Sequence, residues 1–291
     1  MSARVLVTGG TGGIGLAAAE ALARRGVEVL VTGRDAARGA AAERRLRAAG
    51  TPGAFLRADH GSLADTRALV TGLRERLDGL DVLVANVGAM PSVRTTTPEG
   101  LDVELVTDVA GVVLLVDGLR PALAARGGRV VLVTSAAASR APDPLGARPW
   151  DGARGAGMAA YARAKGWKLQ LAAGLAAELS GDGVTVHAAS PGPAWTAMTQ
   201  ANTREALGVP RPVWGIVRAV QRSGRPERAA RCVVEAAAGP DGARSTGLLF
   251  PARGRPRPLG VPRDAGTAAL AAARALATGT VPVVTSRGGH G

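Results

Sequence analysis

The stretch VLVTGGTGGIGLAAAEAL, residues 5–22, decides how the chain begins to fold. Aliphatic residues run directly into a cluster of five glycines, and an alanine-rich segment typical of a helix follows. A glycine-rich turn between a strand and a helix lets the backbone approach a pyrophosphate, which then binds at the helix N-terminus. We therefore predict that this segment is the dinucleotide-binding turn of a βαβ unit.

The glycines fit two spacings that belong to different classes of dinucleotide-binding enzyme. The pattern G-x-x-x-G-x-G uses Gly9, Gly13 and Gly15, whereas G-x-x-G-x-x-G uses Gly9, Gly12 and Gly15. The motif alone does not choose between them. The predicted cofactor loop comprises Gly9, Thr11, Gly12, Gly13, Ile14 and Gly15.

The same alternation of apolar runs and helical patterns continues along the chain. Near-continuous apolar runs are typical of strands that are covered on both faces. Strands are predicted at 4–9, 27–33, 53–59, 80–88, 128–135, 183–192 and 246–250, and helices at 14–25, 35–49, 62–77, 98–125 and 157–180. This order predicts an α/β fold with a doubly wound parallel sheet, the Rossmann fold.

No break in composition divides the chain, so we predict one domain over residues 1–278. Within it, the Pro-, Trp- and Arg-rich segment 193–226 is predicted to be a substrate lid or loop. Residues 279–291 are predicted to form a flexible tail.

Composition argues against several classes of protein. No run of eighteen apolar residues occurs, which argues against membrane insertion, and no secretory signal pattern is present. A single cysteine cannot form an internal disulfide, so we expect a cytoplasmic protein, and no metal site is predicted.

The net charge of +13 could indicate nucleic-acid binding. The arginines are scattered, however, and lysine is almost absent, which is typical of GC-rich coding. We therefore predict no nucleic-acid partner and a general attraction for an anionic cofactor or substrate.

The end of the second predicted strand, VTGRD, indicates the cofactor. Gly33 occupies the position where an acidic residue would bind the ribose 2′-hydroxyl of NAD, and Arg34 follows it. An arginine suits a 2′-phosphate through charge-assisted hydrogen bonds, so we predict NADP(H). Asp35 is expected to cap the next helix.

Two segments carry the candidate catalytic residues. In AYARAK, Tyr161 and Lys165 lie four residues apart and share one helix face. The ordinary pKa of a tyrosine, about 10, must fall by roughly three units for acid–base work near neutral pH, and a neighbouring ammonium group favours that change. Ser135 ends the fifth predicted strand, at the edge where ligands bind in such sheets, and could orient a carbonyl group.

These motifs, in this order, resemble the short-chain dehydrogenase/reductase family over residues 3 to about 277. TGGTGGIG is followed by NVG at 86–88, Ser135, YARAK and SPGPAWT at 190–196. The resemblance implies that Ser135 positions the carbonyl, Tyr161 is the acid/base, and Lys165 binds the nicotinamide ribose and lowers the Tyr161 pKa. It favours the spacing Gly9, Gly13 and Gly15, and implies further cofactor contacts from Asp59, His60, Asn86, Val87, Gly88, Pro191, Gly192 and Thr196.

Within the family, the chain resembles the branch of retinol dehydrogenases and WW-domain oxidoreductases. The long gap between Ser135 and Tyr161, the pattern TTPEGLDVELVTDVAGVVLLVDGLRPAL and the C-terminal stretch STGLLFPARGRPRPLG carry this resemblance. Family members usually form dimers or tetramers through two helices. The resemblance therefore implies a homodimer or homotetramer formed through the apolar faces of 104–119 and 158–175.

Asp108 departs from the family, which usually has a helix asparagine here. An aspartate could preserve the backbone role of that asparagine, compete for the charge of Lys165 and reroute protons, or be only a polar residue at a helix kink. This departure leaves two alternatives to a redox enzyme. One is an epimerase, dehydratase or cyclase that uses bound NADP(H), and the other is a non-catalytic NADP(H) sensor.

The residues predicted to line the substrate pocket are Met90, Trp150, Trp195, Met198 and Trp214. Three tryptophans in a chain with 2% aromatic residues favour an apolar, polycyclic ligand, although ordinary packing of a lid explains them equally well. We expect an NADPH-dependent oxidoreductase that reduces a ketone or aldehyde, or oxidises the matching secondary alcohol. The substrate is expected to resemble a secondary metabolite.

Overall fold

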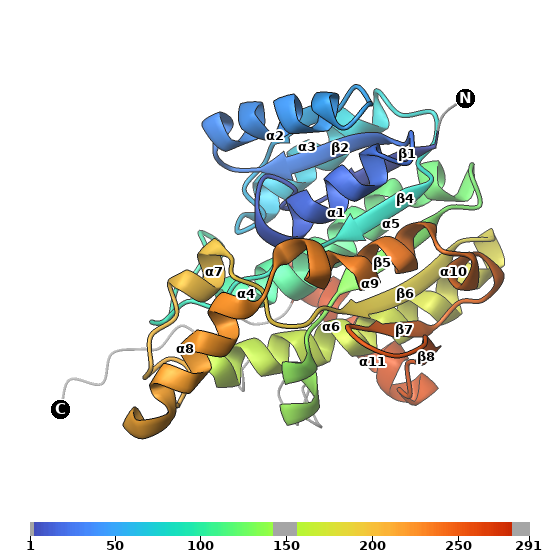
Figure 1. Cartoon of the computed structure of the whole chain (residues 1–291). Coiled ribbons are helices and arrows are strands. Elements are labelled where there is room, and N and C mark those ends of the chain that lie inside the picture. Colours follow the sequence, from blue (N-terminus) through green and yellow to red (C-terminus); the bar gives the residue numbers. More distant parts are fainter. Residues whose placement is uncertain (1–2, 142–155, 281–291) are drawn as a thin grey trace.

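The computed structural model describes residues 3–141 and 156–280, which form one eight-stranded sheet with helices on both faces (Figure 1). The strands are β1 (Arg4–Val7), β2 (Glu28–Gly33), β3 (Ala54–Arg57), β4 (Val82–Ala85), β5 (Arg129–Val133), β6 (Thr185–Ser190), β7 (Leu248–Pro251) and β8 (Arg257–Pro258). Their order is β3-β2-β1-β4-β5-β6-β7-β8, and only β8 pairs antiparallel. The predicted doubly wound parallel sheet is confirmed.

The helices form two layers that bury the two faces of the sheet. They are α1 (Gly13–Ala23), α2 (Ala36–Ala48), α3 (Leu63–Arg74), α4 (Val103–Leu105), η1 (Val106–Ala110), α5 (Gly111–Ala124), η2 (Ala136–Arg140), α6 (Gly157–Leu179), η3 (Ser180–Asp182), α7 (Ala197–Gln200), η4 (Arg211–Val213), α8 (Trp214–Ser223), α9 (Pro226–Ala238), α10 (Pro240–Arg244) and α11 (Arg263–Thr278). Helices α1, α2 and α9 cover one face, and α3, α5, α6 and α11 cover the other (Figure 1). Leu6 of β1 packs in one core while Val5 and Val7 pack in the other, which explains the continuous apolar runs.

The helix predicted over 98–125 differs from the structure in two respects. The helix begins at Val103, and after one turn η1 adopts π-helical geometry over Val106–Ala110 before α5 continues. A π-helical turn accommodates one extra residue in a helix and is frequent at functional sites. Asp108 lies in this turn and is fully buried.

The C-terminal helix α11 packs along α6 and also contacts α5. The backbones of α11 and α6 approach each other closely at two glycines. A Cβ atom at Gly266 of α11 would lie 2.8 Å from the backbone nitrogen of Gly174 on α6. Trp167 Nε1 on α6 donates to the carbonyl of Ala269 at 3.0 Å. Helix α3 also packs against α5, so the helices expected to join subunits contact α3 and α11 within the chain. The homodimer or homotetramer stays a prediction.

The segment predicted as a lid, 193–226, contains the short helix α7 and the helix α8. Ile216 and Val220 of α8 are exposed. The single-domain boundary at 278 stays a prediction, and residues 281–291 of the predicted tail lie outside the described residues.

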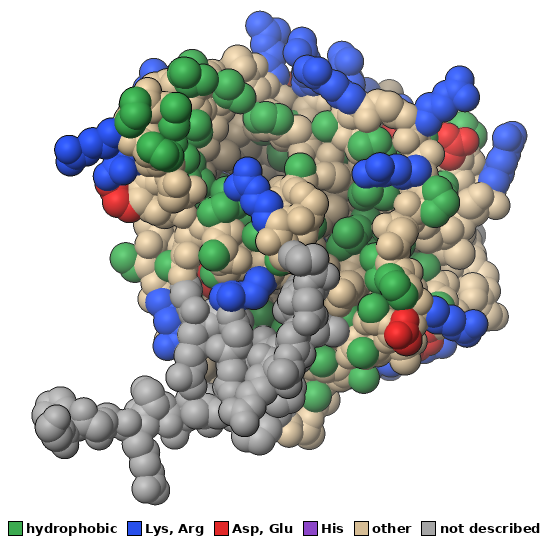
Figure 2. Space-filling view, turned by 90° about the horizontal axis from the view of Figure 1, so that it is seen from below, with side chains coloured by type: hydrophobic (Ala, Val, Ile, Leu, Met, Phe, Trp, Pro, Cys, Tyr) green, Lys and Arg blue, Asp and Glu red, His purple; other side chains and the backbone are tan. Residues whose placement is uncertain are grey.

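Basic side chains are spread over the surface in separate groups rather than in one stripe on the face drawn in Figure 2. Within the part of the chain that the structure describes, no helix is both long and apolar enough to span a bilayer.

Candidate functional site

The glycine-rich loop lies between β1 and α1, where the strand order of the sheet reverses. Gly9 and Gly13 have φ angles of +64° and +54°, in the left-handed region that favours glycine. A Cβ atom at Gly15 would lie 2.5 Å from the carbonyl oxygen of Gly9, whereas one at Gly12 would meet no atom within 4 Å. The backbone therefore requires glycine at the spacing Gly9, Gly13 and Gly15.

The N-terminus of α1 is open toward this loop. Its N-cap residue, Gly12, makes no side-chain cap, and the first turn carries no acidic residue. The free N–H groups and the positive end of the helix dipole suit a phosphate group. The loop therefore fits a dinucleotide pyrophosphate.

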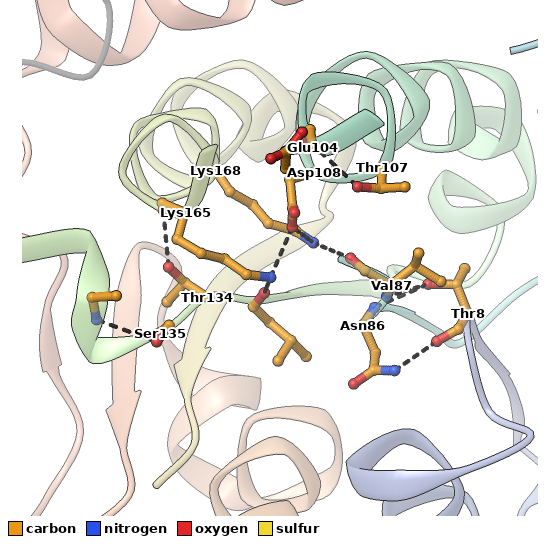
Figure 3. Close-up of polar contacts among 12 residues, drawn as sticks. Thr8, Asn86, Val87, Glu104, Thr107, Asp108, Thr134, Ser135, Lys165 and Lys168 are labelled. Carbon is orange, nitrogen blue, oxygen red and sulfur yellow. Dashed lines mark hydrogen bonds and ion pairs between the residues drawn. The ribbon is translucent and has the colours of Figure 1, made fainter. Parts of the chain in front are cut away.

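Asn86, at the end of β4, ties the loop to the neighbouring strand (Figure 3). Its Nδ2 donates to the carbonyl of Thr8 at 2.9 Å, and Thr8 Oγ1 accepts from the backbone nitrogens of Asn86 at 2.9 Å and Val87 at 3.2 Å. The Asn86 amide thus holds the glycine-rich loop against the end of β4.

The end of β2 has no space for an acidic side chain. A Cβ atom at Gly33 would lie 2.7 Å from Thr11 Oγ1. Arg34 is exposed, and Arg57 of β3 donates from Nε to the Arg34 carbonyl at 3.3 Å. Arg57 was not predicted from the sequence, because only the pairing of β3 with β2 brings it beside Arg34. The expected cap is confirmed, since Asp35 accepts from the Arg38 backbone nitrogen at 3.0 Å.

Asp59 and His60, which follow β3, both form hydrogen bonds within the protein. Asp59 Oδ1 accepts from the Gly61 backbone nitrogen at 2.9 Å. The His60 ring is buried with Nε2 2.7 Å from Thr32 Oγ1, and burial lowers the pKa of His60 to about 4. The ring is therefore neutral near physiological pH, and contact of this pair with adenine stays a prediction.

Ser135 follows β5, and Tyr161 and Lys165 lie on α6, at the carboxyl edge of the sheet. Ser135 caps η2, accepting from the Ala137 backbone nitrogen at 3.2 Å, and η2 packs against α6. Lys165 Nζ lies 5.5 Å from the centroid of the Tyr161 ring. Among the described residues, no hydrogen-bond partner of the Tyr161 hydroxyl is found.

Lys165 forms an ion pair with Asp108 inside the protein (Figure 3). Its Nζ donates to Asp108 Oδ1 at 2.7 Å and to the Val133 carbonyl at 3.2 Å, which leaves one of its three N–H groups for a ligand. Gly88 leaves room for this pair, because a Cβ atom there would lie 2.6 Å from Lys165 Nζ. The expected encounter between the Asp108 carboxylate and Lys165 therefore occurs.

Lys168, one turn after Lys165, was not predicted as a site residue. Its Nζ donates to Asp108 Oδ1 at 3.0 Å and to the Val87 carbonyl at 2.9 Å, and its side chain is fully buried. One signal in the sequence could have revealed it: the chain has only two lysines, and they lie three residues apart on one helix.

Burial and the shared ion pairs shift the pKa values of all three groups. Burial raises the pKa of Asp108, but the two ammonium groups outweigh burial and hold that pKa below its ordinary value. Burial lowers the pKa of Lys165, but the Asp108 carboxylate outweighs burial and raises it. For Lys168, burial and the charge of Lys165 lower the pKa to about 8 despite Asp108. At neutral pH the cluster therefore holds one negative and two positive charges.

Glu104 precedes Asp108 by four residues, and both of its carboxylate oxygens are buried without a hydrogen-bond partner among the described residues. Burial, with the nearby Asp102 and Asp108, raises the pKa of Glu104 to about 7. Because the folded-state pKa lies above the ordinary value, folding takes up a proton between these two pKa values. The contribution of Glu104 to stability is thus complete at low pH and is lost as pH rises through about 7.

We expect Glu104→Gln to stabilise the protein at about pH 8 by roughly 1 kcal/mol and to have little effect at about pH 5. Urea unfolding at both pH values measures the free energy of unfolding of the variant and of the wild type. Glu75→Gln, the same substitution at an exposed position, is the control and should not change the free energy of unfolding at either pH. An equal effect of Glu104→Gln at both pH values would contradict the prediction that the buried Glu104 carboxyl group takes up a proton on folding.

Of the residues predicted to line the substrate pocket, the structure brings Trp195 and Trp214 to one arginine side chain. The rings of Trp195 and Trp214 both face the guanidinium of Arg218, at 4.7 and 5.5 Å, in cation–π contacts. These contacts fit ordinary lid packing as well as a ligand surface. Met90 and Met198 are half-buried, and Trp150 lies outside the described residues.

The segment 190–196 lies beside the glycine-rich loop. A Cβ atom at Gly13 would lie 3.0 Å from Thr196 Cγ2, and Thr196 caps α7. The expected contacts of Pro191, Gly192 and Thr196 with the nicotinamide stay predictions.

Comparison with known proteins gives a family match. The model of the family "short chain dehydrogenase" matches residues 3–207. The chain is 42% identical over 146 residues to a Streptomyces sp. (strain C5) protein assigned as a daunorubicin C-13 ketoreductase, covering 48% of this chain and 50% of that protein. The matches span 50% to 63% of the length of the first curated relatives.

Solved structures align over more of the chain. The Pseudomonas aeruginosa RhlG/NADP active-site complex has a TM-score of 0.66 and 29% identity, over 86% of this chain and 94% of that one. A short chain dehydrogenase from Burkholderia cenocepacia in complex with NADP has a TM-score of 0.66 and 30% identity, over 86% and 95%.

Proposed function

Because this chain belongs to the short-chain dehydrogenase/reductase family, we propose that it is an NADP(H)-dependent oxidoreductase that reduces a ketone or aldehyde, or oxidises the matching secondary alcohol. The observation that carries the proposal is the grouping of Ser135, Tyr161 and Lys165 at the carboxyl edge of the sheet. A glycine loop with an open helix N-terminus lies at the same edge.

The residues around this edge fit NADP(H). The loop Gly9–Gly15 and the N-terminus of α1 would hold the pyrophosphate, Arg34 and Arg57 the 2′-phosphate, and Lys165 a ribose hydroxyl. When bound, the cofactor supplies or accepts the hydride at the carbonyl carbon. The NADP named in the titles of two similar structures supports this choice of cofactor.

The chain's own residues supply the proton chemistry. The Ser135 oxygen accepts one hydrogen bond, and its O–H would donate to a substrate carbonyl. During reduction the Tyr161 hydroxyl gives a proton to the same carbonyl oxygen, and the neighbouring Lys165 ammonium stabilises the phenolate that remains. The reverse reaction uses the same groups.

We further propose an apolar, polycyclic ketone as the substrate. The half-buried Trp195, Trp214 and Met198 of the lid segment support this, as does the likeness to a protein assigned as a daunorubicin ketoreductase. The test is NADPH oxidation by the purified protein with a panel that pairs polycyclic ketones with small aliphatic ones. Faster turnover of the small ketones would reject the substrate class. Tight NADPH binding with no turnover of any ketone would favour the sensor or the non-redox enzymes.

Arg34→Ala is expected to raise the KM for NADPH about tenfold or more and to leave the KM for NADH nearly unchanged. The loss of charge-assisted hydrogen bonds to a phosphate, worth roughly 1.5–3 kcal/mol, explains the size. Steady-state kinetics with both cofactors measures it, and Arg57→Ala should act in the same direction. Arg44→Ala, a change on the exposed side of α2, is the control. Equal effects on both cofactors would contradict recognition of the 2′-phosphate.

A further inference from the structure

Three charged side chains that are almost completely buried meet at one oxygen atom. Asp108 Oδ1 accepts from Lys165 Nζ at 2.7 Å and from Lys168 Nζ at 3.0 Å, and the side chains of Asp108 and Lys168 are 0% exposed (Figure 3). The other carboxylate oxygen, Oδ2, has no partner among the described residues. The arrangement thus joins one carboxylate to two ammonium groups, only one of which lies beside Tyr161.

We propose that Lys168 is a positioning residue that offsets the Asp108 carboxylate, so that Lys165 keeps its full effect as the cation beside Tyr161. This rests on the proposed function in one respect, the role of Tyr161 as the acid/base.

The argument is one of local charge. A buried carboxylate at 2.7 Å from Lys165 would by itself neutralise the field of that ammonium group at the phenol, and buried charges are weakly screened. With the Lys168 ammonium group included, the net charge of these three groups is one positive charge. An uncompensated positive charge favours the phenolate over the phenol, whereas a closed, neutral pair favours it much less.

The position of Lys168 fits this role. The Val87 carbonyl accepts from its Nζ at 2.9 Å, which holds the ammonium group beside Asp108 in the protein interior. Two other titratable groups interact with the cluster, Glu104 with Asp108 and His60 with Lys168. Among the described residues, only Lys165 and Lys168 donate hydrogen bonds to the Asp108 carboxylate. Lys168 is therefore the group that balances Asp108 directly.

Tyr161 allows a direct test, because it is the only tyrosine in the chain. Its phenolate absorbs in the near ultraviolet, so difference spectra report its ionisation alone. The measurement uses the full-length protein with saturating NADP⁺, and is repeated on the free protein. It requires no substrate and no turnover.

In Lys168→Met we expect the phenolate-to-phenol ratio at about pH 7.5 to fall roughly tenfold, the size of one pKa unit. The double variant Asp108→Asn/Lys168→Met removes both charges and should return the ratio to the wild-type value. Lys168→Gln, which keeps hydrogen-bonding capacity without the charge, should behave as Lys168→Met and serves if the latter fails to fold. Near-ultraviolet circular dichroism checks folding in each case.

Two results would overturn the proposal. One is an unchanged ratio in both single variants, which would make Lys168 a purely structural partner of Asp108. The other is a lowered ratio that the double variant fails to restore, because Lys168 would then act other than through Asp108. Absence of turnover with every ketone, combined with the expected ratios, would reject the proposed function and leave the charge balance standing.

Discussion

Tyr161→Phe is expected to lower kcat about a thousandfold while NADPH binding stays within about twofold of wild type. The substitution removes only the hydroxyl group, and a positioned acid or base contributes typically 10²–10⁴-fold to a rate. The ring and its contact with Lys165 are kept, so the fold should not change. Initial rates of NADPH oxidation and a fluorescence titration of NADPH measure the two quantities.

Trp195→Phe is a useful control, since it alters an aromatic residue of the lid segment that has no role in proton transfer. It should change KM for the substrate more than kcat. Wild-type turnover in Tyr161→Phe would reject Tyr161 as the acid/base. Equal loss of NADPH binding and turnover would show that the tyrosine serves the cofactor site instead.

Gly15→Ala is expected to weaken NADPH binding at least about a hundredfold, which corresponds to roughly 3 kcal/mol. A Cβ atom at this position would lie 2.5 Å from both the Gly9 carbonyl oxygen and Asn86 Nδ2. Neither neighbour can yield easily, because the Gly9 oxygen belongs to the backbone and the Asn86 amide holds the loop to the end of β4. The loop must therefore move away from the geometry that receives the pyrophosphate.

Gly12→Ala is the matched control within the same loop. Gly12 has an extended backbone, with φ of −174°, and open space around its Cβ position. Its substitution should change the Kd for NADPH much less than Gly15→Ala does. A larger effect at Gly12 than at Gly15 would contradict the spacing of Gly9, Gly13 and Gly15.

The fold could be predicted because its signals are local. Each apolar run, such as 128–135 or 183–192, corresponds to a strand, and the repeated strand–helix order allows few topologies. The short antiparallel strand β8 was missed, because two residues, Arg257–Pro258, carry no hydrophobic pattern. The π-helical turn at Val106–Ala110 was missed for a related reason, since one extra residue in a helix barely disturbs its periodicity.

The candidate site was predicted residue by residue only in part. Tyr161 and Lys165 lie on one helix, so their spacing alone shows that they share a face. The partner of Arg34 could not be read in the same way, because Arg57 belongs to another strand. The choice between the two glycine spacings came from the order of the downstream motifs, and the backbone angles of Gly9 and Gly13 and the close contacts at Gly15 fit it.

The amino-acid sequence by itself determined the doubly wound sheet, the glycine-rich turn and the lysine beside the tyrosine, because each follows from periodicity or spacing within a short segment. Only the tertiary structure decided what the unusual Asp108 does. Its carboxylate meets Lys165 and Lys168 across 57 and 60 residues of chain, inside a core where water and salt screen the charges only weakly. The balance of charge at such a point depends on distances that no linear pattern records.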